Sequence, residues 1–253
     1  MRRIIFITLI LFLTLNFNVW AITGNEILKK VDERTIGEKA PKDVEAIMTM
    51  TIVSAKGTKR IRELKAWTKN NIDKDDWRVM KFLSPPDVRN VGFLVLSDDQ
   101  MYLYLPEFHR IRRIASHNKK ESFMGSDFSY EDMGTSGFTK FYDAKLLNEN
   151  DKEWILELTR KPNVSKPYSK IKMWVSKQSE LPEKMELYDN AGNLWKVAEE
   201  EAKKIGNYWI PVKIKMKDMK KNSYTVLEMK DIKVDQGLGS RIFTKRFLRR
   251  RVK

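Results

Sequence analysis

Apolar and polar residues alternate along most of the chain between Ala46 and Val234. In residues 212–217, Val, Ile and Met take every second position and a lysine follows each of them. A strand with this pattern has one apolar and one charged face, which suits an antiparallel sheet with one face in water. Comparable runs recur at short intervals, separated by turn sequences such as Lys56-Gly57-Thr58. We therefore predict a mainly β (α+β) fold with a single antiparallel sheet of about 10–11 strands, which curves because open sheets of that size rarely stay flat.

The apolar concave face of such a sheet must be covered, and two segments are candidates for the cover. Thr23 and Glu26 have the spacing of a capping box and precede apolar residues on one helical face, which predicts a helix that ends before Gly37 and Pro41. Residues 115–150 lack a period-two pattern, and segments of that length are usually functional or helical. We expect short helices there that form a lid over the sheet, within a single domain of residues 22–253.

The apolar strand faces and the underside of this lid predict which side chains line a cavity. In residues 101–105 only one set of side chains can face inward, and we choose Met101, Leu103 and Leu105 over the two tyrosines. Methionines are frequent on the same faces, and their flexible side chains suit a variable ligand. The candidate lining residues are Met48, Met50, Ile52, Met101, Leu103, Leu105, Leu156, Met173, Met185, Ile214 and Met216 on strands, and Phe123, Met124, Phe128, Tyr130 and Met133 on the lid.

The first 21 residues have the organisation of a cleavable secretory signal. Arg2 and Arg3 precede an apolar run from Ile4 to Leu13, and residues 19–21 provide small-x-small spacing for cleavage near Ala21. The alternative is a membrane anchor, which needs about 20 apolar residues, more than this run contains. Because the chain has no cysteine, we expect an exported protein that is not itself lipidated and has no disulfides.

The chain carries a formal net charge of +15. Such an excess often marks nucleic-acid binding, but export and the lack of helix-turn-helix, zinc or RNA-recognition patterns argue against that partner. An anionic membrane surface is the more natural partner, since each Lys or Arg near it contributes about 1 kcal/mol. The candidates for docking to acidic headgroups or to a transporter are Lys245, Arg246, Arg249, Arg250 and Arg251. The alternative interpretation of this C-terminal run is a solvated chain end.

Catalytic and metal-binding patterns are weak in this sequence. A triad of Ser126, His117 and Asp127 can be drawn, but no Gly-x-Ser-x-Gly elbow accompanies it, and nearby cations disfavour a protonated imidazole. His109 is the other histidine, and without cysteines or a spaced carboxylate cluster we expect no metal site, no cofactor and no enzyme activity. A structural role fits the acids better, with Asp127 as a helix N-cap and Glu131 or Asp132 in the first turn.

Several segments together resemble a known family. They are residues 82–89 (FLSPPDVR), 101–107 (MYLYLPE), 112–114 (RRI), 122–132 (SFMGSDFSYED) and 243–248 (FTKRFL). The most specific block contains Gly125, Ser126, Asp127, Glu131 and Asp132. On these segments the chain resembles the outer-membrane lipoprotein-sorting proteins, the LolA/LolB-like carriers of diderm bacteria, over essentially all of the predicted mature chain. The resemblance implies an unclosed β-barrel with helices over its open side and an apolar cavity that shelters acyl chains in the periplasm.

The resulting hypothesis is a monomeric periplasmic carrier that moves a lipoprotein or a free lipid between membranes without chemistry. The resemblance implies an inner-membrane transporter as donor and an outer-membrane acceptor, and it supplies no catalytic residues. One alternative is an accessory module of a lipid exporter that never carries cargo alone. A hydrolase is the third reading.

Overall fold

A computed structural model describes residues 22–72, 75–134 and 137–252. The described residues form one 13-stranded sheet in which every neighbouring pair is antiparallel. The strands are β1 Asp43–Val53, β2 Lys59–Lys69, β3 Trp77–Ser84, β4 Gly92–Ser97, β5 Gln100–Leu105, β6 Arg110–Arg113, β7 Tyr142–Glu149, β8 Glu153–Arg160, β9 Lys170–Ser176, β10 Pro182–Tyr188, β11 Leu194–Ile205, β12 Tyr208–Asp218 and β13 Ser223–Val234. The predicted mainly β, unclosed architecture is confirmed. The strand number is higher than the expected 10–11.

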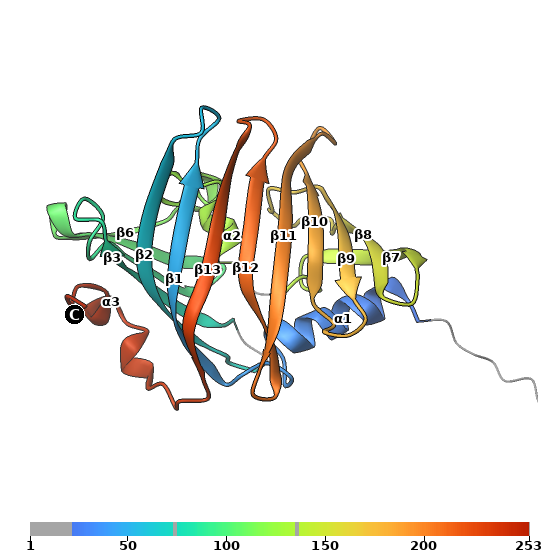
Figure 1. Ribbon diagram of the computed structural model, residues 1–253, viewed down its shortest axis with the longest axis horizontal. Helices are drawn as coiled ribbons and strands as arrows, with labels where there is room; N and C mark the ends of the chain where they lie inside the picture. Colours follow the sequence, from blue (N-terminus) through green and yellow to red (C-terminus); the bar gives the residue numbers. More distant parts are fainter. Residues whose placement is uncertain (1–21, 73–74, 135–136, 253) are drawn as a thin grey trace, which may run out of the picture.

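The sheet is continuous through its middle and open at both ends (Figure 1). The order is β6-β5-β4-β3-β2-β1-β13-β12-β11-β10-β9-β8-β7, so the first and last strands of the chain pair at the centre. In this central pair Met48 lies opposite Met229, and Met50 lies opposite Leu227. The edge strands are therefore β6 and β7, and the chain between them must pass from one edge of the sheet to the other.

The N-terminal helix α1 (Gly24–Thr35) begins as its sequence predicts. Thr23 and Glu26 form the capping box, with the Thr23 N–H donating to Glu26 Oε2 at 2.7 Å. Asn25 Oδ1 accepts the Ala144 N–H of β7 at 2.7 Å. A Cβ on Gly24 would lie 2.5 Å from the Ala144 carbonyl oxygen, so only glycine permits this contact. The helix thus covers the β7 edge, while Ile27, Leu28 and Val31 are buried in the core.

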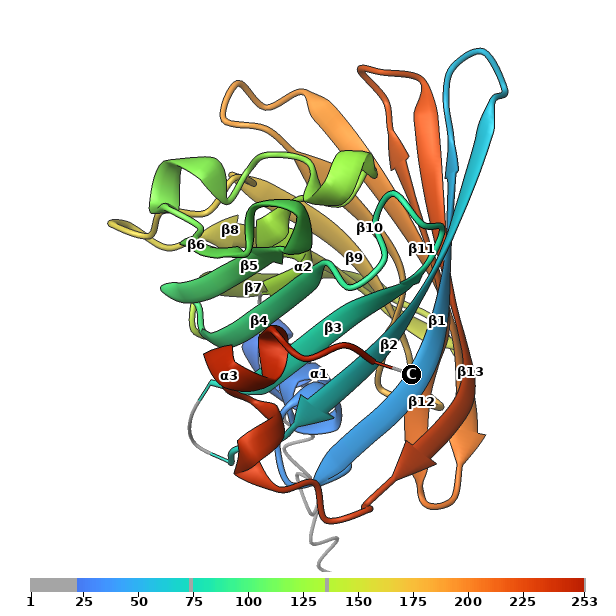
Figure 2. The same cartoon turned by 90° about the vertical axis from the view of Figure 1, so that its left-hand side faces the viewer.

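The connection between β6 and β7 is shorter than the predicted insertion of residues 115–150. Its end, Tyr142–Glu149, forms edge strand β7, in which Tyr142, Ala144 and Leu146 are the more buried positions. Before β7 lie the 3-10 turns η2 (Ser116–Asn118) and η3 (Phe123–Gly125) and the helix α2 (Tyr130–Gly134). We call residues 114–134 the lid. Figure 2 shows the lid crossing the side of the sheet that α1 also covers.

Apolar side chains form two separate cores, one on each face of the sheet. The larger core holds the buried faces of α1, the lid and most strands. The smaller core lies on the opposite face of β2–β6, where alternate residues such as Trp67 and Tyr104 point, and it is covered by the C-terminal segment. That segment contains the 3-10 turn η4 (Ser240–Ile242) and the helix α3 (Lys245–Leu248), which packs beside β4 (Figure 2). The remaining short element, η1 (Pro106–Phe108), links β5 to β6.

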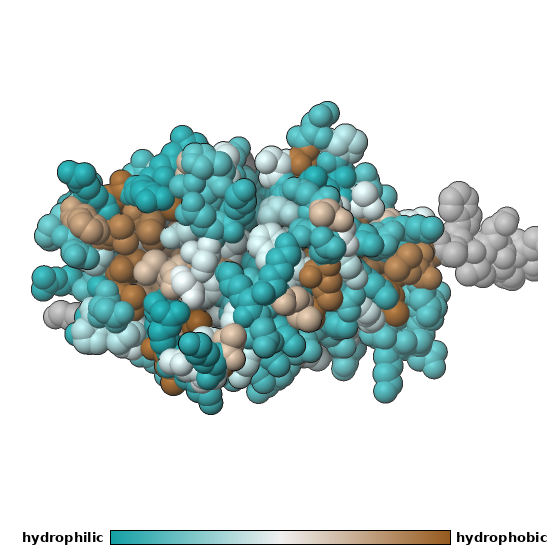
Figure 3. All heavy atoms as spheres, turned by 90° about the horizontal axis from the view of Figure 1, so that it is seen from above, coloured by the Kyte–Doolittle hydropathy of each residue, from teal (hydrophilic) through white to brown (hydrophobic). Residues whose placement is uncertain are grey.

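The outer surface is largely hydrophilic. Seen from above, hydrophobic patches interrupt it, the most extensive lying toward the side of β3–β6 (Figure 3). No helix in the described part of the chain is long and apolar enough to cross a membrane.

Candidate lipid-binding site under the lid

The lid is held on the sheet by polar contacts from its sequence motif, residues 122–132. Asp127 is 5% exposed, and its carboxylate accepts hydrogen bonds from Ser223 Oγ at 2.5 Å and Thr225 Oγ1 at 2.6 Å on β13. The Asp127 N–H donates in turn to Thr225 Oγ1 at 2.9 Å. The prediction that Asp127 is a helix N-cap is therefore wrong, because its carboxylate binds a central strand of the sheet.

Ser129 is the residue that caps α2. The Asp132 N–H donates to Ser129 Oγ at 3.1 Å, and the Ser129 N–H donates to Asp132 Oδ2 at 2.8 Å, which is the reciprocal pattern of a capping box. The Asp132 carboxylate also accepts from Tyr168 Oη at 2.8 Å and Lys196 Nζ at 2.9 Å. Burial and the neighbouring Asp132 carboxylate raise the pKa of Tyr168 well above its usual value, so this hydroxyl stays a donor.

A second buried ion pair joins Glu131 to Lys166, whose side chains are 5% and 6% exposed. Lys166 also lies 3.5 Å from Asp98. The first turn of α2 is therefore acidic, as the sequence predicts, but both acids are paired with lysines from outside the lid. Breaking a buried pair by removing one partner typically costs about 3–5 kcal/mol, so these contacts define a closed lid position.

The backbone before α2 makes a tight turn over β2. Met124 has φ +53° and Gly125 has φ +76°, both in the left-handed region. Arg62 Nη1 of β2 donates to the Met124 carbonyl, and Arg60 Nη2 donates to the Gly125 carbonyl at 3.4 Å. Ser126 Oγ donates to the Phe123 carbonyl at 2.7 Å and closes the turn. Glycine at position 125 suits this conformation, and the serine fixes it.

Phe128 projects from the lid between two apolar pockets. The first has a volume of about 190 Å³, with a floor formed by β9–β12 and a roof formed by the lid. Its lining residues are Phe128, Glu131, Asp132, Gly137, Phe138, Tyr142, Lys166, Pro167, Tyr168, Ile171, Met185, Leu187, Ala198, Glu200, Ile214 and Met216. The second, of about 280 Å³, lies over β1–β3 and β12–β13 and includes Met48, Met80, Met133, Leu227 and Met229. Phe128, Asp132 and Ile214 line both pockets, so the two spaces are neighbours.

Some of the predicted lining residues do line these pockets, and the others lie in or against the larger core. Met48, Phe128, Met133, Met185, Ile214 and Met216 line one or both pockets. The others belong to or pack against the larger core without lining these pockets: Met50, Ile52, Met101, Leu103, Leu105, Phe123, Met124, Tyr130, Leu156 and Met173. Phe123 and Tyr130 stack edge to face at 5.6 Å and anchor the lid near Phe93. Three further pocket residues, Ile171, Leu187 and Ala198, were not predicted. Ile171 and Leu187 each lie two residues from a predicted residue, Met173 and Met185, and so share its strand face.

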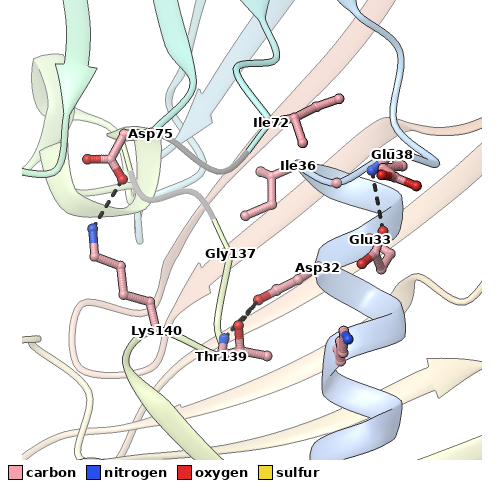
Figure 4. Close-up of a pocket in the computed structure, with 11 residues that line it drawn as sticks. Asp32, Glu33, Ile36, Glu38, Ile72, Asp75, Gly137, Thr139 and Lys140 are labelled. Atoms are coloured by element: carbon pink, nitrogen blue, oxygen red, sulfur yellow. Dashed lines mark hydrogen bonds and ion pairs between the residues drawn. The ribbon is translucent and has the colours of Figure 1, made fainter.

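A larger depression near the end of α1 is polar and open (Figure 4). Its volume is about 720 Å³, and six of its eleven lining residues are charged. Asp32 accepts from Thr139 Oγ1 at 2.6 Å, and Lys140 Nζ lies 3.1 Å from Asp75. These contacts hold the chain after the lid against α1, and the many charged side chains of the depression suit an acyl chain poorly.

Ser126, His117 and Asp127 do not form a catalytic arrangement. The Ser126 hydroxyl bonds backbone carbonyls, the Asp127 carboxylate bonds Ser223 and Thr225, and His117 is exposed. No group of three His, Cys, Asp or Glu side chains within the described ranges has the arrangement of a metal site.

The five C-terminal basic residues are all exposed: Lys245, Arg246, Arg249, Arg250 and Arg251. Their backbone is nevertheless fixed on the sheet, since Phe247 packs edge to face on Trp67 at 5.4 Å. Lys81 is fully buried beneath them, and its Nζ donates to the carbonyls of Leu248 at 2.5 Å and Arg250 at 2.7 Å. Burial lowers the pKa of Lys81 to about 8. The C-terminal run is therefore a docked segment that presents its cations outward.

Known proteins share this sequence family and this architecture. A family model of DUF1329-like uncharacterized proteins matches residues 74–250, more than half of the chain. The chain belongs to this DUF1329-like family. A solved DUF1329 family protein from Desulfovibrio piger is similar, with 27% identity and a TM-score of 0.82 over 89% of this chain and 97% of the other.

Two further solved structures share this fold. A putative outer membrane lipoprotein-sorting protein domain from Vibrio parahaemolyticus has 28% identity and a TM-score of 0.80, covering 90% of this chain and 98% of the other. A LolA superfamily protein from Nitrosomonas europaea has 23% identity and a TM-score of 0.72, covering 90% and 100%. No curated protein matches the sequence. This DUF1329-like protein thus has the fold of a LolA superfamily protein, as the sequence resemblance predicts.

Proposed function

We propose that this DUF1329-like protein is a periplasmic carrier that shelters the acyl chains of a lipoprotein or lipid under its lid. The observation that carries the proposal is a curved sheet with an apolar inner face, roofed by a segment that is attached through polar contacts and leaves apolar pockets beneath it. A fully packed core would not need a covering segment that is attached separately. The family fold supports the same function.

Both pockets are small because the lid lies closed over the sheet. Binding pockets for small ligands span about 300–1,000 Å³, so neither the 190 Å³ nor the 280 Å³ space holds a long acyl chain. Cargo entry requires the lid to lift and Phe128 to leave its place between the two pockets. Each methylene that then leaves water contributes about 0.8 kcal/mol, and a C16 chain can therefore offset the loss of one or two buried lid contacts.

The charge of the exposed surface supports exchange of cargo with membranes. The outward-facing cations of the C-terminal segment dock the carrier to acidic headgroups, and an inner-membrane transporter and an outer-membrane acceptor are the expected partners. The predicted signal segment lies outside the described residues. Export and cleavage near Ala21 remain part of the proposal.

A disulfide lock tests whether the lid gates binding. The double variant Asp127→Cys/Thr225→Cys replaces two side chains that touch in the closed state, in a chain that has no other cysteine. The oxidised form should lose binding of a fluorescent fatty-acyl probe, and reduction should restore it. The oxidised single variant Thr225→Cys is the control. Equal probe binding by the oxidised and reduced double variant contradicts the proposal.

Native mass spectrometry of protein purified from periplasm identifies the natural cargo. A carrier should retain a lipid or lipidated peptide, and this mass should disappear in the oxidised lock. Protein that is consistently empty and bound to a partner would instead indicate an accessory module.

A further inference from the structure

Under the lid, Glu200 has no partner among the residues that the structure describes. Glu200 lies on β11 opposite Ile214 of β12, and it points to the same face as Ala198. It lines the 190 Å³ pocket among Ile171, Met185, Leu187 and Met216. Within residues 22–72, 75–134 and 137–252, no hydrogen bond or ion pair reaches its carboxylate.

The other acids of this pocket are already neutralised. Glu131 is paired with Lys166, and Asp132 with Lys196 and the Tyr168 hydroxyl. Glu200 is partly exposed and borders the pocket, and burial alone raises its pKa to about 7. An unpaired carboxylate in apolar surroundings is costly, and in a stable protein such a group usually has a functional role.

We propose that this pocket takes the polar end of an amphiphile that carries a primary ammonium group, with Glu200 as its counter-ion. This inference rests on the proposed carrier function and names the class of lipid headgroup that the site prefers. The chain of the amphiphile then runs past Phe128 into the neighbouring 280 Å³ pocket, whose walls include Met48, Leu227 and Met229.

The charges in the pocket decide between headgroups. An ammonium group supplies the donor and the positive charge that Glu200 lacks, whereas a ligand carboxylate places two like charges together. The net charge of the whole chain is +15, so long-range attraction alone would favour the anionic ligand. A preference for the cation can therefore only come from a local acid.

Three probes with the same chain test the inference: dodecylammonium, dodecanol and dodecanoate, each titrated below its micelle concentration at pH 8 by displacement of a fluorescent acyl probe. The wild-type protein should bind dodecylammonium about ten-fold more tightly than dodecanoate, a difference of about 1.4 kcal/mol. Glu200→Gln should bring the two affinities within about two-fold while leaving dodecanol binding unchanged.

Glu199→Gln is the matched control, because Glu199 is the adjacent acid on the opposite, exposed face of β11. It should keep the ten-fold preference. Equal binding of the cation and the anion by wild type, or an unchanged preference in Glu200→Gln, overturns the headgroup assignment while dodecanol binding still supports the carrier. Failure of all three probes to bind overturns the carrier proposal and this inference together.

Discussion

The ion pair between Asp132 and Lys196 should be one of the strongest attachments of the lid. It joins α2 to β11 at 2.9 Å, and the two side chains are 9% and 4% exposed. Asp132→Ala leaves the Lys196 ammonium buried without its carboxylate and also removes the acceptor for the Tyr168 hydroxyl and for the Ser129 N–H, which is one half of the α2 capping box. Loss of one partner of a buried pair costs about 3–5 kcal/mol.

The free energy of unfolding, measured in urea, should fall by this amount. For a domain of this size the midpoint of thermal unfolding should fall by about 6–20 °C. Lys196→Met should cost a similar amount, and the double variant Asp132→Ala/Lys196→Met should cost clearly less than the sum, because it leaves no unpaired charge. Hydrogen exchange should accelerate first in residues 123–134, where the lid opens locally.

The neighbouring surface pair between Glu201 and Lys213 serves as the control. It has nearly the same length, 2.8 Å, but side-chain exposures of 62% and 38%. Glu201→Ala should change stability by less than about 1 kcal/mol. If Asp132→Ala costs no more than Glu201→Ala, the lid is held by apolar packing and the reasoning fails.

Three further outcomes follow from other charged groups. Glu200→Gln should stabilise the protein above pH 8 by up to about 3 kcal/mol and have little effect at pH 4.5. The reason is that folding raises the Glu200 pKa from 4.5 to about 7, so the wild-type protein loses stability as this carboxyl ionises. Urea unfolding measured across this pH range checks the prediction. Lys81→Met should expose residues 245–252 to limited proteolysis, since both carbonyl contacts of Lys81 disappear; unchanged cleavage would mean that Phe247 and Leu248 suffice. Replacing Arg249, Arg250 and Arg251 by serine should weaken binding to anionic vesicles by about 3 kcal/mol at low salt and leave neutral vesicles unaffected.

Local features were predictable from the sequence. The capping box of Thr23 and Glu26 depends on residues three apart, and the first hairpin depends on Gly57 at a turn with φ +81°. The curved antiparallel sheet follows from the period-two pattern of the strands, and its unclosed form was implied by the family resemblance. β7 was missed because Lys145, Leu147 and Asn148 blur its alternation, and its pairing with β8 shifts register near Leu146.

The lid contacts could not be predicted, because they join residues far apart in sequence. Asp127 and Thr225 are 98 residues apart, and Asp132 and Lys196 are 64 apart. Glu200 did leave a signal. Glu199, Glu200 and Glu201 are consecutive acids in a strand, and because successive side chains alternate between faces, at least one of them must point inward.

The strand order limits how far this protein can open. The β1–β13 ladder joins the two halves of the sheet at the centre, and the chain from β6 to β7 ties their outer edges together across the inner face. Any flattening of the sheet therefore stretches that tie, and any lifting of the lid lets the edges separate. Loading should thus change curvature and lid height together, and cargo size is bounded by the length of one covalent loop that cannot detach.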